Sequence, residues 1–417
     1  MLIDVRTPNA NHPFVTDRAE QDPAAEISPG PVSFELITTR AGFDALEDDW
    51  NALFDRAARG VHVFQTFNWN WHWANHFLAD DDRDPVGVRL SIVVGRRDGR
   101  LVTVWPLVKQ KVRGVTQIFW MGEPVSQYGD VLVDDAPDTL EILEHAWMFL
   151  KARVRGDLLR LRRVRADASI APLLLRSDAI VTDRQTAPFL DLASAKSFGA
   201  YEERYSPRSR RNRRRLARRL AEEGEMAFQH LAGGVAARKL ALKALELKAH
   251  WLKDRGLVSN ALADPRTTAF FADAAEAKER STNCIVSALH VGGEPAALEV
   301  SFACKGRLAM HVIVFDLKFE KSGVGVLRLE QSLRDGYEHG LDTYDMLAPG
   351  DGYKLDWADG TVEVLDYAKA RSLAGELYAR VYLGFVRPRG KAAMKAMPSA
   401  LRRAVSGSYA LAAAVSL

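Results

Sequence analysis

Two patterns of apolar residues divide the first half of the chain into predicted strands and helices. Alternating apolar and polar positions predict strands, and apolar residues spaced three and four apart predict helices. Strands are expected at 33–38, 88–94, 101–110, 116–121, 128–133, 157–161 and 189–192, and helices at 43–54, 68–77 and 139–153. Arg96-Arg97-Asp98-Gly99 lies between two of these strands and predicts a tight hairpin.

The second half repeats this order of elements. Strands are expected at 225–231, 284–291, 295–304, 308–317 and 341–347, and helices at 206–223, 240–251, 267–280 and 326–339. Gly292-Gly293 predicts a second hairpin. Because the same order occurs twice, we expect a mixed α/β (α+β) protein of two related domains, each a mostly antiparallel sheet flanked by helices. The expected segments are a tail at 1–31, domains at 32–195 and 196–383, and a C-terminal extension at 384–417.

The composition fits a globular protein of this size. The 417 residues are too many for one ordinary domain, and 47% hydrophobic and 27% charged residues are ordinary proportions. No window approaches the roughly 20 unbroken apolar residues of a membrane-spanning helix. The first 31 residues carry an early Asp4, several prolines and no apolar core, so they predict a mobile tail and no signal peptide. Only two cysteines occur in the chain, so we expect a reducing, cytoplasmic location.

Candidate metal ligands are few in the sequence. Cys284 and Cys304 have no C-x-x-C spacing, so neither a zinc site nor a disulfide framework is expected. His72 and His76 stand four residues apart, as in a zinc-binding helix, but Trp73 occupies the place of the glutamate in H-E-x-x-H. We therefore predict no metal, buried thiols, and histidines that pack or face solvent.

Positive charge is concentrated in one segment. The net charge is +3, yet residues 204–219 contain nine arginines and no acid, which leaves −6 for the rest. Ser206 as N-cap and Pro207 at the first helical position predict a helix, with Asn212, Leu216 and Leu220 on its apolar face. The helix could simply be solvated, or its arginines, Arg208 and Arg211 among them, could bind an anionic acceptor, coenzyme phosphates or a polymer.

Residues 308–357 combine the features expected of a reaction site. A buried strand runs into Glu320-Lys321-Ser322-Gly323-Val324-Gly325, and a helix follows at once. Backbone amides at such a turn and the helix dipole attract a phosphate, and glycine lets the chain come close to it. After the next strand, 349–357 is a predicted polar loop that gathers carboxylates, a phenol, an amine and an indole.

The order of these elements and several motifs resemble the GNAT superfamily of acyl-CoA-dependent acyltransferases, and within it the CelD-like branch associated with cellulose biosynthesis. The motifs are Tyr353-Lys354-x-x-Trp357 after Asp345-x(4)-Gly350, Ser206-Pro207-Arg208-Ser209-Arg210-Arg211-Asn212, and Phe64-Gln65-Thr66-Phe67-Asn68-Trp69. The resemblance covers residues 34–383 in scattered blocks. The layout is also similar to FemAB-type aminoacyl transferases, which implies two tandem GNAT-like domains. The first is degenerate, with Asp134-Asp135-Ala136-Pro137 where the second has its glycine turn.

The resemblance implies an acyltransferase that uses acetyl-CoA or another acyl-CoA and forms no covalent enzyme intermediate. Strand 308–317 would hold the pantetheine, and Ser322, Gly323, Val324, Gly325 and Val326 would cradle the pyrophosphate. The family's phosphate loop begins with Gln or Arg, and Glu320 stands at that position here.

Side chains for proton transfer and substrate binding follow from the same resemblance. Glu299, Asp345 or Asp351 could be the base and Tyr353 the acid, with Lys354 as an anion clamp and Trp357 beside it. Each has a structural alternative: an ion pair for Glu299, turn capping for Asp345 and Asp351, and pinning of the loop for the other three. Tyr128 and Asp130 of the first domain could line the acceptor cleft or merely shape a turn.

Three functions remain open at this point. The first is an N- or O-acyltransferase for a small-molecule or glycan acceptor, in polysaccharide or cell-envelope assembly as the CelD-like resemblance implies. The second is a FemAB-like transferase that takes its group from aminoacyl-tRNA, and the third is a non-catalytic binding scaffold. The acceptor, the acyl length and the oligomeric state have no signature in the sequence. Residues 387–417 could form an amphipathic helix that docks on the other domain, which we favour, or that touches a membrane surface.

Overall fold

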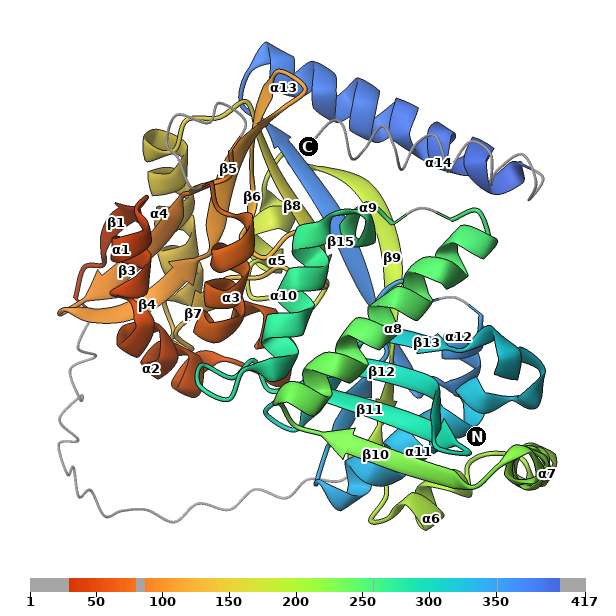
Figure 1. Ribbon diagram of the computed structural model, residues 1–417. Helices are drawn as coiled ribbons and strands as arrows, with labels where there is room; N and C mark the ends of the chain where they lie inside the picture. Colours follow the sequence, from red (N-terminus) through yellow and green to blue (C-terminus); the bar gives the residue numbers. More distant parts are fainter. Residues whose placement is uncertain (1–29, 80–86, 258, 351, 398–417) are drawn as a thin grey trace, which may run out of the picture. The chain divides into compact units, whose positions relative to one another are not determined.

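Two sheets carry the strands of this computed structural model, which describes residues 30–79, 87–257, 259–350 and 352–397 (Figure 1). The smaller sheet has the order β1-β3-β4-β7, and the larger has the order β10-β11-β12-β13-β14-β9-β15-β8-β6-β5-β2. The described residues from Val32 onward form one compact unit. The predicted mixed α/β fold, with mixed sheets flanked by helices, is confirmed.

The first half contains the predicted elements, but the strands predicted at 88–94 and 101–110 are each divided between the two sheets, and the strand predicted at 189–192 begins at Ile180. Its strands are β1 (Ser33–Ile37), β2 (Arg89–Leu90), β3 (Ile92–Arg97), β4 (Arg100–Trp105), β5 (Leu107–Val112), β6 (Val115–Trp120), β7 (Leu132–Val133), β8 (Leu158–Arg165) and β9 (Ile180–Asp191). Its helices are α1 (Arg40–Asp44), α2 (Glu47–Ala57), η1 (Gly60–Gln65), α3 (Phe67–Phe77), α4 (Thr139–Arg153), α5 (Ala171–Arg176) and η2 (Leu192–Ser194). The strand predicted at 128–133 is shorter than expected, because only its last two residues pair.

The second half repeats the arrangement and adds helices at both ends. Its strands are β10 (Met226–Leu231), β11 (Cys284–Val291), β12 (Glu294–Cys304), β13 (Arg307–Phe315), β14 (Thr343–Asp345) and β15 (Gly360–Ala370). Its helices are α6 (Phe198–Glu202), α7 (Pro207–Glu223), α8 (Val235–Asp254), α9 (Asn260–Ala263), α10 (Pro265–Glu276), η3 (Leu317–Ser322), α11 (Val324–Glu338), α12 (Tyr353–Trp357), α13 (Leu373–Leu377), η4 (Tyr378–Val386) and α14 (Arg387–Ala396). Residues 353–357 were predicted as loop and form α12 instead.

Local sequence signals explain the elements that were predicted best. Asp98 and Gly99 have φ angles of 51° and 77°, and Gly292 and Gly293 have 59° and 83°. Two successive left-handed residues match the right-handed twist of the strands on either side, so both hairpins close as predicted. The Ser206 side chain accepts a hydrogen bond from the Ser209 amide and caps α7 at the predicted residue.

The two halves exchange their last strands. β9 ends the first half but pairs with β14 of the second, while β15 of the second half pairs with β8 of the first. β9 and β15 also pair with each other, from Gly360 opposite Phe189 to Ala368 opposite Ile180. Each half keeps one parallel pair with a helix between its strands, β6 with β8 around α4 and β13 with β14 around α11. One continuous sheet therefore joins the halves.

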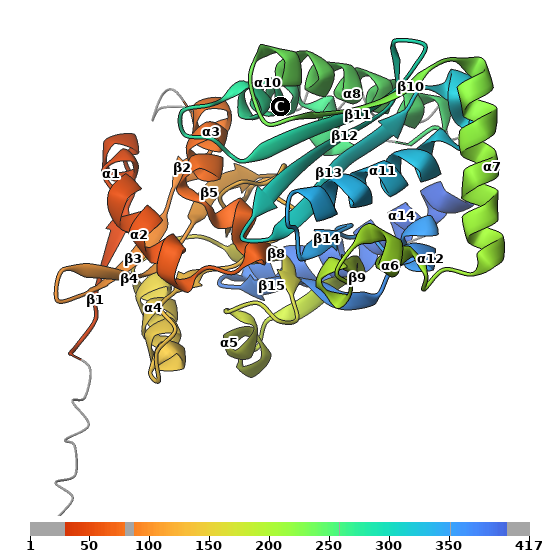
Figure 2. The ribbon, with the colours of Figure 1, turned by 90° about the horizontal axis from the view of Figure 1, so that it is seen from below.

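Helices cover both faces of the second half of this sheet. Figure 2 shows α8 and α10 on one face of β11, β12 and β13, and α11 on the opposite face, with the arginine-rich α7 beside α11. The apolar core on the α8 side includes Val286, Leu298, Val300 and Phe302 with Ala241 and Phe271. Among the described residues, no helix has both the length and the apolar character needed to cross a bilayer.

Candidate functional site

Strands β13 and β14 run side by side for three residue pairs and then separate. The pairing joins Arg307–Ala309 to Thr343–Asp345. From Met310 to Phe315, β13 pairs within the described chain with β12 on its other side. This stretch of β13 therefore presents one strand edge, whose backbone groups can bind an extended ligand. Lys248 of α8 reaches the same stretch and donates from Nζ to the carbonyl of Ile313 at 3.2 Å.

His311 is the extra residue of a β-bulge in β13. Val300 pairs with Val312, while the next residue, Ser301, pairs with Met310, so His311 has no partner on β12. The bulge directs the imidazole among aromatic rings of both halves, namely Phe64, Trp69, Phe271 and Phe302. Its Nε2 lies 2.6 Å from the Val125 carbonyl oxygen, so Nε2 carries the proton and donates. Burial lowers the pKa of His311 to about 4.

This low pKa predicts that the fold is sensitive to acid. An unfolded histidine binds its proton near pH 6.5, so between pH 6.5 and 4 the unfolded state binds more protons than the folded state. The stabilisation by neutral His311 is complete above pH 6.5 and is lost as the pH falls to 4, a loss of about 3 kcal/mol. Urea unfolding of the wild type and His311→Gln across this range measures it. We expect a flatter profile for the variant, and parallel profiles would contradict the assignment.

The glycine turn connects β13 to α11 and lies against α7. Gly323 has φ 74°, a left-handed conformation that favours glycine, and α11 begins at the next residue. A Cβ at Gly323 would lie 2.8 Å from the Leu216 side chain of α7. Ser322 is buried and donates from Oγ to Glu223 at 2.8 Å, and the Val324 side chain is also buried. The side chains of this turn therefore serve packing, and what it can offer an anion is the backbone amides of the first turn of α11.

The carboxylate at the start of the glycine turn is paired. Glu320 accepts a hydrogen bond from Arg255 of α8 at 2.5 Å. This ion pair offsets the negative charge that stands where the family has Gln or Arg. A pyrophosphate at the turn would thus meet a neutral pair instead of a lone carboxylate.

Glu299 lies in a buried polar network beneath α11. It forms an ion pair with Arg328 and accepts hydrogen bonds from Ser301, Ser332 and Tyr344, with the Tyr344 hydroxyl at 2.6 Å. Burial raises the pKa of Tyr344 to about 12, although the nearby charge of Arg328 acts to lower it. The sequence left open an ion pair or a base for Glu299. The geometry is that of a satisfied buried ion pair.

Asp345 joins the two halves of the chain. Its carboxylate accepts from the Tyr128 hydroxyl and from Arg307, both at 2.9 Å, and from the Leu347 amide at 2.9 Å. Arg165 of β8 contributes a longer bond at 3.5 Å and lies over the Tyr128 ring. Burial, and then the charge of Asp345, raise the pKa of Tyr128 well above its ordinary value. Tyr128 thus reaches the second half, where its buried hydroxyl donates to Asp345.

The two described candidate bases lie on opposite faces of the sheet. Tyr344 contacts Glu299 on the α11 face, and successive residues of a strand point to opposite faces. Asp345 therefore faces the other side, where it meets Tyr128. The two carboxylates cannot act as alternatives on one substrate atom. Asp351, the third candidate, lies outside the described residues.

The predicted motif Tyr353-Lys354-x-x-Trp357 forms the short helix α12. Tyr353 is 41% exposed, which makes it the accessible group of the three. Lys354 donates from Nζ to the carbonyls of Leu347 and Pro349, both at 3.2 Å. Trp357 is buried against the ring of Tyr205, with 5.0 Å between centroids. Lys354 and Trp357 therefore hold the segment in place, while Tyr353 can meet a substrate.

Asp130 has a structural setting in the first half. Its carboxylate accepts from the amides of Ser169 and Ile170 and lies 3.0 Å from His62 Nε2. The side chain is buried. These contacts tie the loop before β7 to the loop after β8, as in the turn-shaping alternative.

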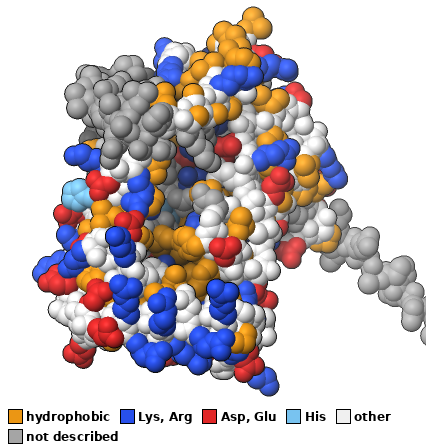
Figure 3. All heavy atoms as spheres, turned by 90° about the vertical axis from the view of Figure 1, so that its right-hand side faces the viewer, with side chains coloured by type: hydrophobic (Ala, Val, Ile, Leu, Met, Phe, Trp, Pro, Cys, Tyr) orange, Lys and Arg blue, Asp and Glu red, His pale blue; other side chains and the backbone are white. Residues whose placement is uncertain are grey.

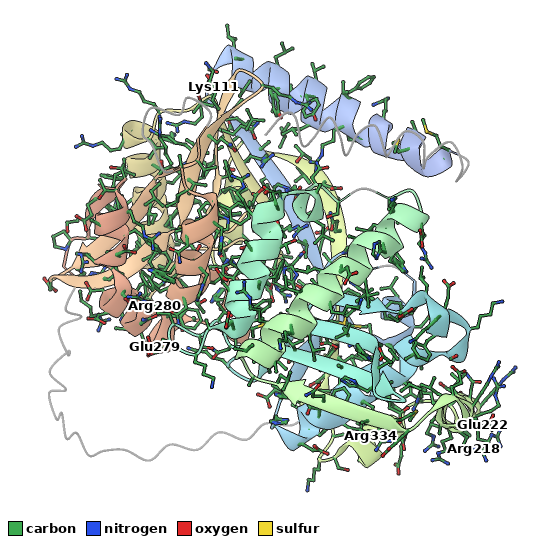
Figure 4. The ribbon with its side chains drawn as sticks, viewed as in Figure 1. Lys111, Arg218, Glu222, Glu279, Arg280 and Arg334 are labelled. Carbon is green, nitrogen blue, oxygen red and sulfur yellow. The ribbon has the colours of Figure 1, made fainter. Side chains whose placement is uncertain are left out.

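The arginine-rich helix α7 carries one buried arginine and an open groove. Arg213 is buried, pairs with Glu330 at 2.9 Å and lies over the Trp357 ring. The prediction that Asn212 lies on the packed face is wrong, because Arg213 occupies that place and Asn212 is exposed. A groove of about 590 Å³ is lined by Ser206, Arg208, Ser209, Arg211, Asn212 and Arg215. On the face of the molecule drawn in Figure 3, basic side chains lie along the lower edge, and the surface is hollowed above them. Figure 4 shows Arg218 and Glu222 on the outer side of α7.

Three side chains at the other end of α11 come close enough to suggest a metal site. His230, Asp335 and His339 have potential ligand atoms within 4.8 Å of one another. However, the two imidazoles are stacked at 4.4 Å with 13° between their planes, and His230 hydrogen-bonds to Asp335 at 2.6 Å. An imidazole lone pair lies in the ring plane, so two stacked rings cannot both direct one at the same ion. His72 and His76 contact the Arg280 carbonyl and Asp273 respectively and do not converge.

A comparison with protein families finds one match, in the second half of the chain. Residues 207–355 match the acetyltransferase (GNAT) domain family. The matched GNAT segment begins at the first residue of α7 and ends within α12. It therefore contains the β13 edge, the glycine turn, Glu299 and Asp345. No curated protein matches the chain in sequence.

The chain is similar to several solved structures at low sequence identity. FemX aligns with a TM-score of 0.54 and 11% identity over 84% of this chain and 99% of its own. L-PGS from Bacillus licheniformis has a TM-score of 0.46 and 13% identity, covering 80% of this chain and 95% of that one. A tandem GNAT protein from the clavulanic acid biosynthesis pathway has 0.41 and 13%, covering 81% and 98%. The likeness to FemX shows a common fold.

Several residues of these networks were not found from the sequence. Arg328, Tyr344, Arg307 and Arg165 hold the two candidate carboxylates. One signal was present for Arg328, which stands four residues after Val324 and four before Ser332 on the buried face of α11. A buried charge needs a partner of opposite charge. A single basic residue on an apolar helix face, such as Arg328, and a single acidic residue in an apolar strand, such as Glu299, are therefore expected to pair.

Proposed function

We propose that this chain transfers an acyl group from a coenzyme A thioester to an amine or hydroxyl of a small-molecule or glycan acceptor. The observation that carries the proposal is the path from the open edge of β13 into the turn at Gly323 and the start of α11. The match of residues 207–355 to the GNAT domain supports it. An acceptor in cell-envelope or polysaccharide assembly, the CelD-like affiliation and a cytoplasmic location are parts of the same proposal.

In the proposed reaction, backbone groups of β13 hold the pantetheine and polarise the thioester carbonyl, and the first amides of α11 bind the pyrophosphate. The acceptor nitrogen or oxygen attacks the carbonyl carbon and loses a proton to a base, the C–S bond breaks, and the departing thiolate takes a proton. Glu299 and Asp345 are held in buried networks, so we assign the base to Asp351. Tyr353, exposed on α12, supplies the proton to sulfur.

Coenzyme binding at the turn is tested by Gly325→Asp. A Cβ at Gly325 would meet the Phe315 ring at 3.6 Å, an ordinary contact, so the side chain fits. An acid in the first turn of a helix is favourable, so we expect folding to be retained. The same carboxylate opposes the pyrophosphate, and we expect acetyl-CoA to bind at least about tenfold more weakly in calorimetry.

Gly325→Ala is the control for the added Cβ, because it introduces that atom without a charge, and it is expected to bind acetyl-CoA like the wild type. Thiol release with candidate amines and amino sugars then reports turnover. Equal acetyl-CoA affinity of wild type, Gly325→Ala and Gly325→Asp would place the coenzyme elsewhere. If the wild type binds no acyl-CoA, the chain is either a non-catalytic binding scaffold or a transferase that uses aminoacyl-tRNA.

The groove on α7 favours a second candidate, a transferase that takes its group from aminoacyl-tRNA. Arg208, Arg211 and Arg215 line that groove, and arginine is well suited to phosphate oxygens. In this case charged tRNA would bind to the full chain and acetyl-CoA would not. The affinity would fall steeply with salt, as phosphate contacts require.

A further inference from the structure

The helix formed by α13, η4 and α14 has apolar residues on two opposite faces. One face packs on the larger sheet, where Ala379 and Leu383 join Val115 and Leu158 of the first half and Ala368 of β15 in a small core. The other face is exposed. Its large apolar residues are Leu373 at 91%, Leu377 at 65%, Val381 at 46%, Phe385 at 52% and Val386 at 48% exposure. We call these five residues the outer stripe.

The spacing of the outer stripe aligns it along the helix. Leu373, Leu377, Val381 and Phe385 follow one another at steps of four residues, which keeps side chains on one side of a helix. The buried Ala379 and Leu383 stand two residues away from the stripe positions, on the opposite side. A single surface helix needs only one apolar stripe to pack on its protein, so the second stripe calls for a partner.

Positive charge surrounds the outer stripe. Residues 373–397 contain five lysines and arginines and one acid, Glu376, for a net charge of +4, whereas the whole chain has +3. Glu376 is paired with Arg380. The β5–β6 hairpin adds two exposed cations: Arg113 lies over the Tyr382 ring at 4.8 Å, and Figure 4 shows Lys111 beside the beginning of this helix. Two acids of the first half already have partners: Asp178 pairs with Lys369, and Asp157 accepts a hydrogen bond from Ser372 at the start of α13.

The charge decides between the possible occupants of the outer stripe. A second copy of the chain would bring two sets of cations together, which is unfavourable at an interface. Residues 398–417 contain Arg402 and Arg403 and no acid, so they would repel the same surface. An anionic bilayer complements both features, because its acyl region accepts the apolar side chains and its headgroups attract the cations.

We propose that residues 373–396 bind to the surface of an anionic membrane, with the outer stripe in the interface and the flanking cations at the headgroups. Figure 1 shows this helix along one edge of the chain, and Figure 3 shows apolar and basic side chains mixed along the same upper edge. The face that would meet the lipid is thus accessible. Membrane binding goes beyond acyl transfer and needs no catalysis, so either proposal can fail without the other.

Sedimentation of the full chain with lipid vesicles tests this proposal. We expect binding to vesicles of phosphatidylcholine with phosphatidylglycerol, weak binding to phosphatidylcholine alone, and weakening by salt. Leu377→Gln combined with Phe385→Gln should reduce vesicle binding at least about tenfold. Leu175→Gln is the matched control, because Leu175 on α5 is 74% exposed and lies outside the outer stripe. This control is expected to bind like the wild type.

Three results would overturn the proposal. They are no binding to anionic vesicles, equal binding by the wild type and the double variant, and a dimer in light scattering that the double variant dissociates. The last result would assign the outer stripe to a second copy of the chain. Because both substituted side chains are exposed, circular dichroism should show unchanged folding, and loss of binding then reports the surface itself.

Discussion

Replacing Glu299 with glutamine is expected to lower the free energy of unfolding by about 3–5 kcal/mol, as for other broken buried ion pairs. The variant keeps the size of the side chain and removes its charge. Arg328, 3% exposed, would then hold a buried positive charge whose only acidic partner among the described residues is gone. Hydrogen bonds from Ser301, Ser332 and Tyr344 would also weaken, because an amide oxygen is a poorer acceptor than a carboxylate. Guanidinium unfolding followed by circular dichroism measures the loss.

The double variant Glu299→Met/Arg328→Met separates a structural pair from a catalytic base. Removing both charges takes away the desolvation penalty together with the attraction, so we expect more than half of the lost stability to return. If Glu299→Gln folds as stably as the wild type but releases no thiol from acyl-CoA, Glu299 is the base and our interpretation of the network is wrong. Stability and activity falling together, with partial rescue in the double variant, would confirm the pair.

Asp345→Asn is expected to be about as damaging, with a loss of about 3–5 kcal/mol. Asp345 has 0% exposure and holds Arg307 of its own half together with Arg165 and Tyr128 of the other half. The substitution leaves two arginines facing a neutral amide at the junction of the exchanged strands. Chemical unfolding with both near-ultraviolet and far-ultraviolet detection would show whether the halves still unfold in one transition.

Asp342→Asn is the matched control for this experiment. Asp342 is an exposed aspartate three residues before Asp345, so its loss should change stability by less than about 0.5 kcal/mol. An Asp345→Asn protein with wild-type stability and no acyl transfer would instead make Asp345 a catalytic residue. That outcome would reopen the choice among the three candidate bases.

Features encoded by neighbouring residues could be predicted from the sequence. The two hairpins follow from Asp98-Gly99 and Gly292-Gly293, since only left-handed residues fit these turns. The start of α7 follows from Ser206 and Pro207, and α4 covers the predicted residues 139–153. In each case the signal and the structure that it specifies lie within a few residues of one another.

The candidate site was predicted in part, for the same reason. The turn at Gly323 and the helix after it are local, so their geometry was foreseen. The partners of Glu299 and Asp345 come from other strands and helices, and Arg165 is 180 residues away from Asp345. No local sequence pattern specifies which basic side chain pairs with which acidic side chain at that distance along the chain. The loop predicted at 349–357 becomes helical at α12, where Trp357 packs against Tyr205 of a distant segment.

The sequence by itself determined the mixed α/β class, the repeated order of elements and the glycine turn, because hydrophobic periodicity and turn residues act over short distances. Tertiary structure alone decided that β9 and β15 change places between the halves and that Glu299 and Asp345 face opposite sides of one sheet. It also decided that Leu216 covers Gly323. These three features depend on pairing and packing between elements that are remote in the sequence. Many different partners would fit the same local sequence pattern, and only the complete fold selects one of them.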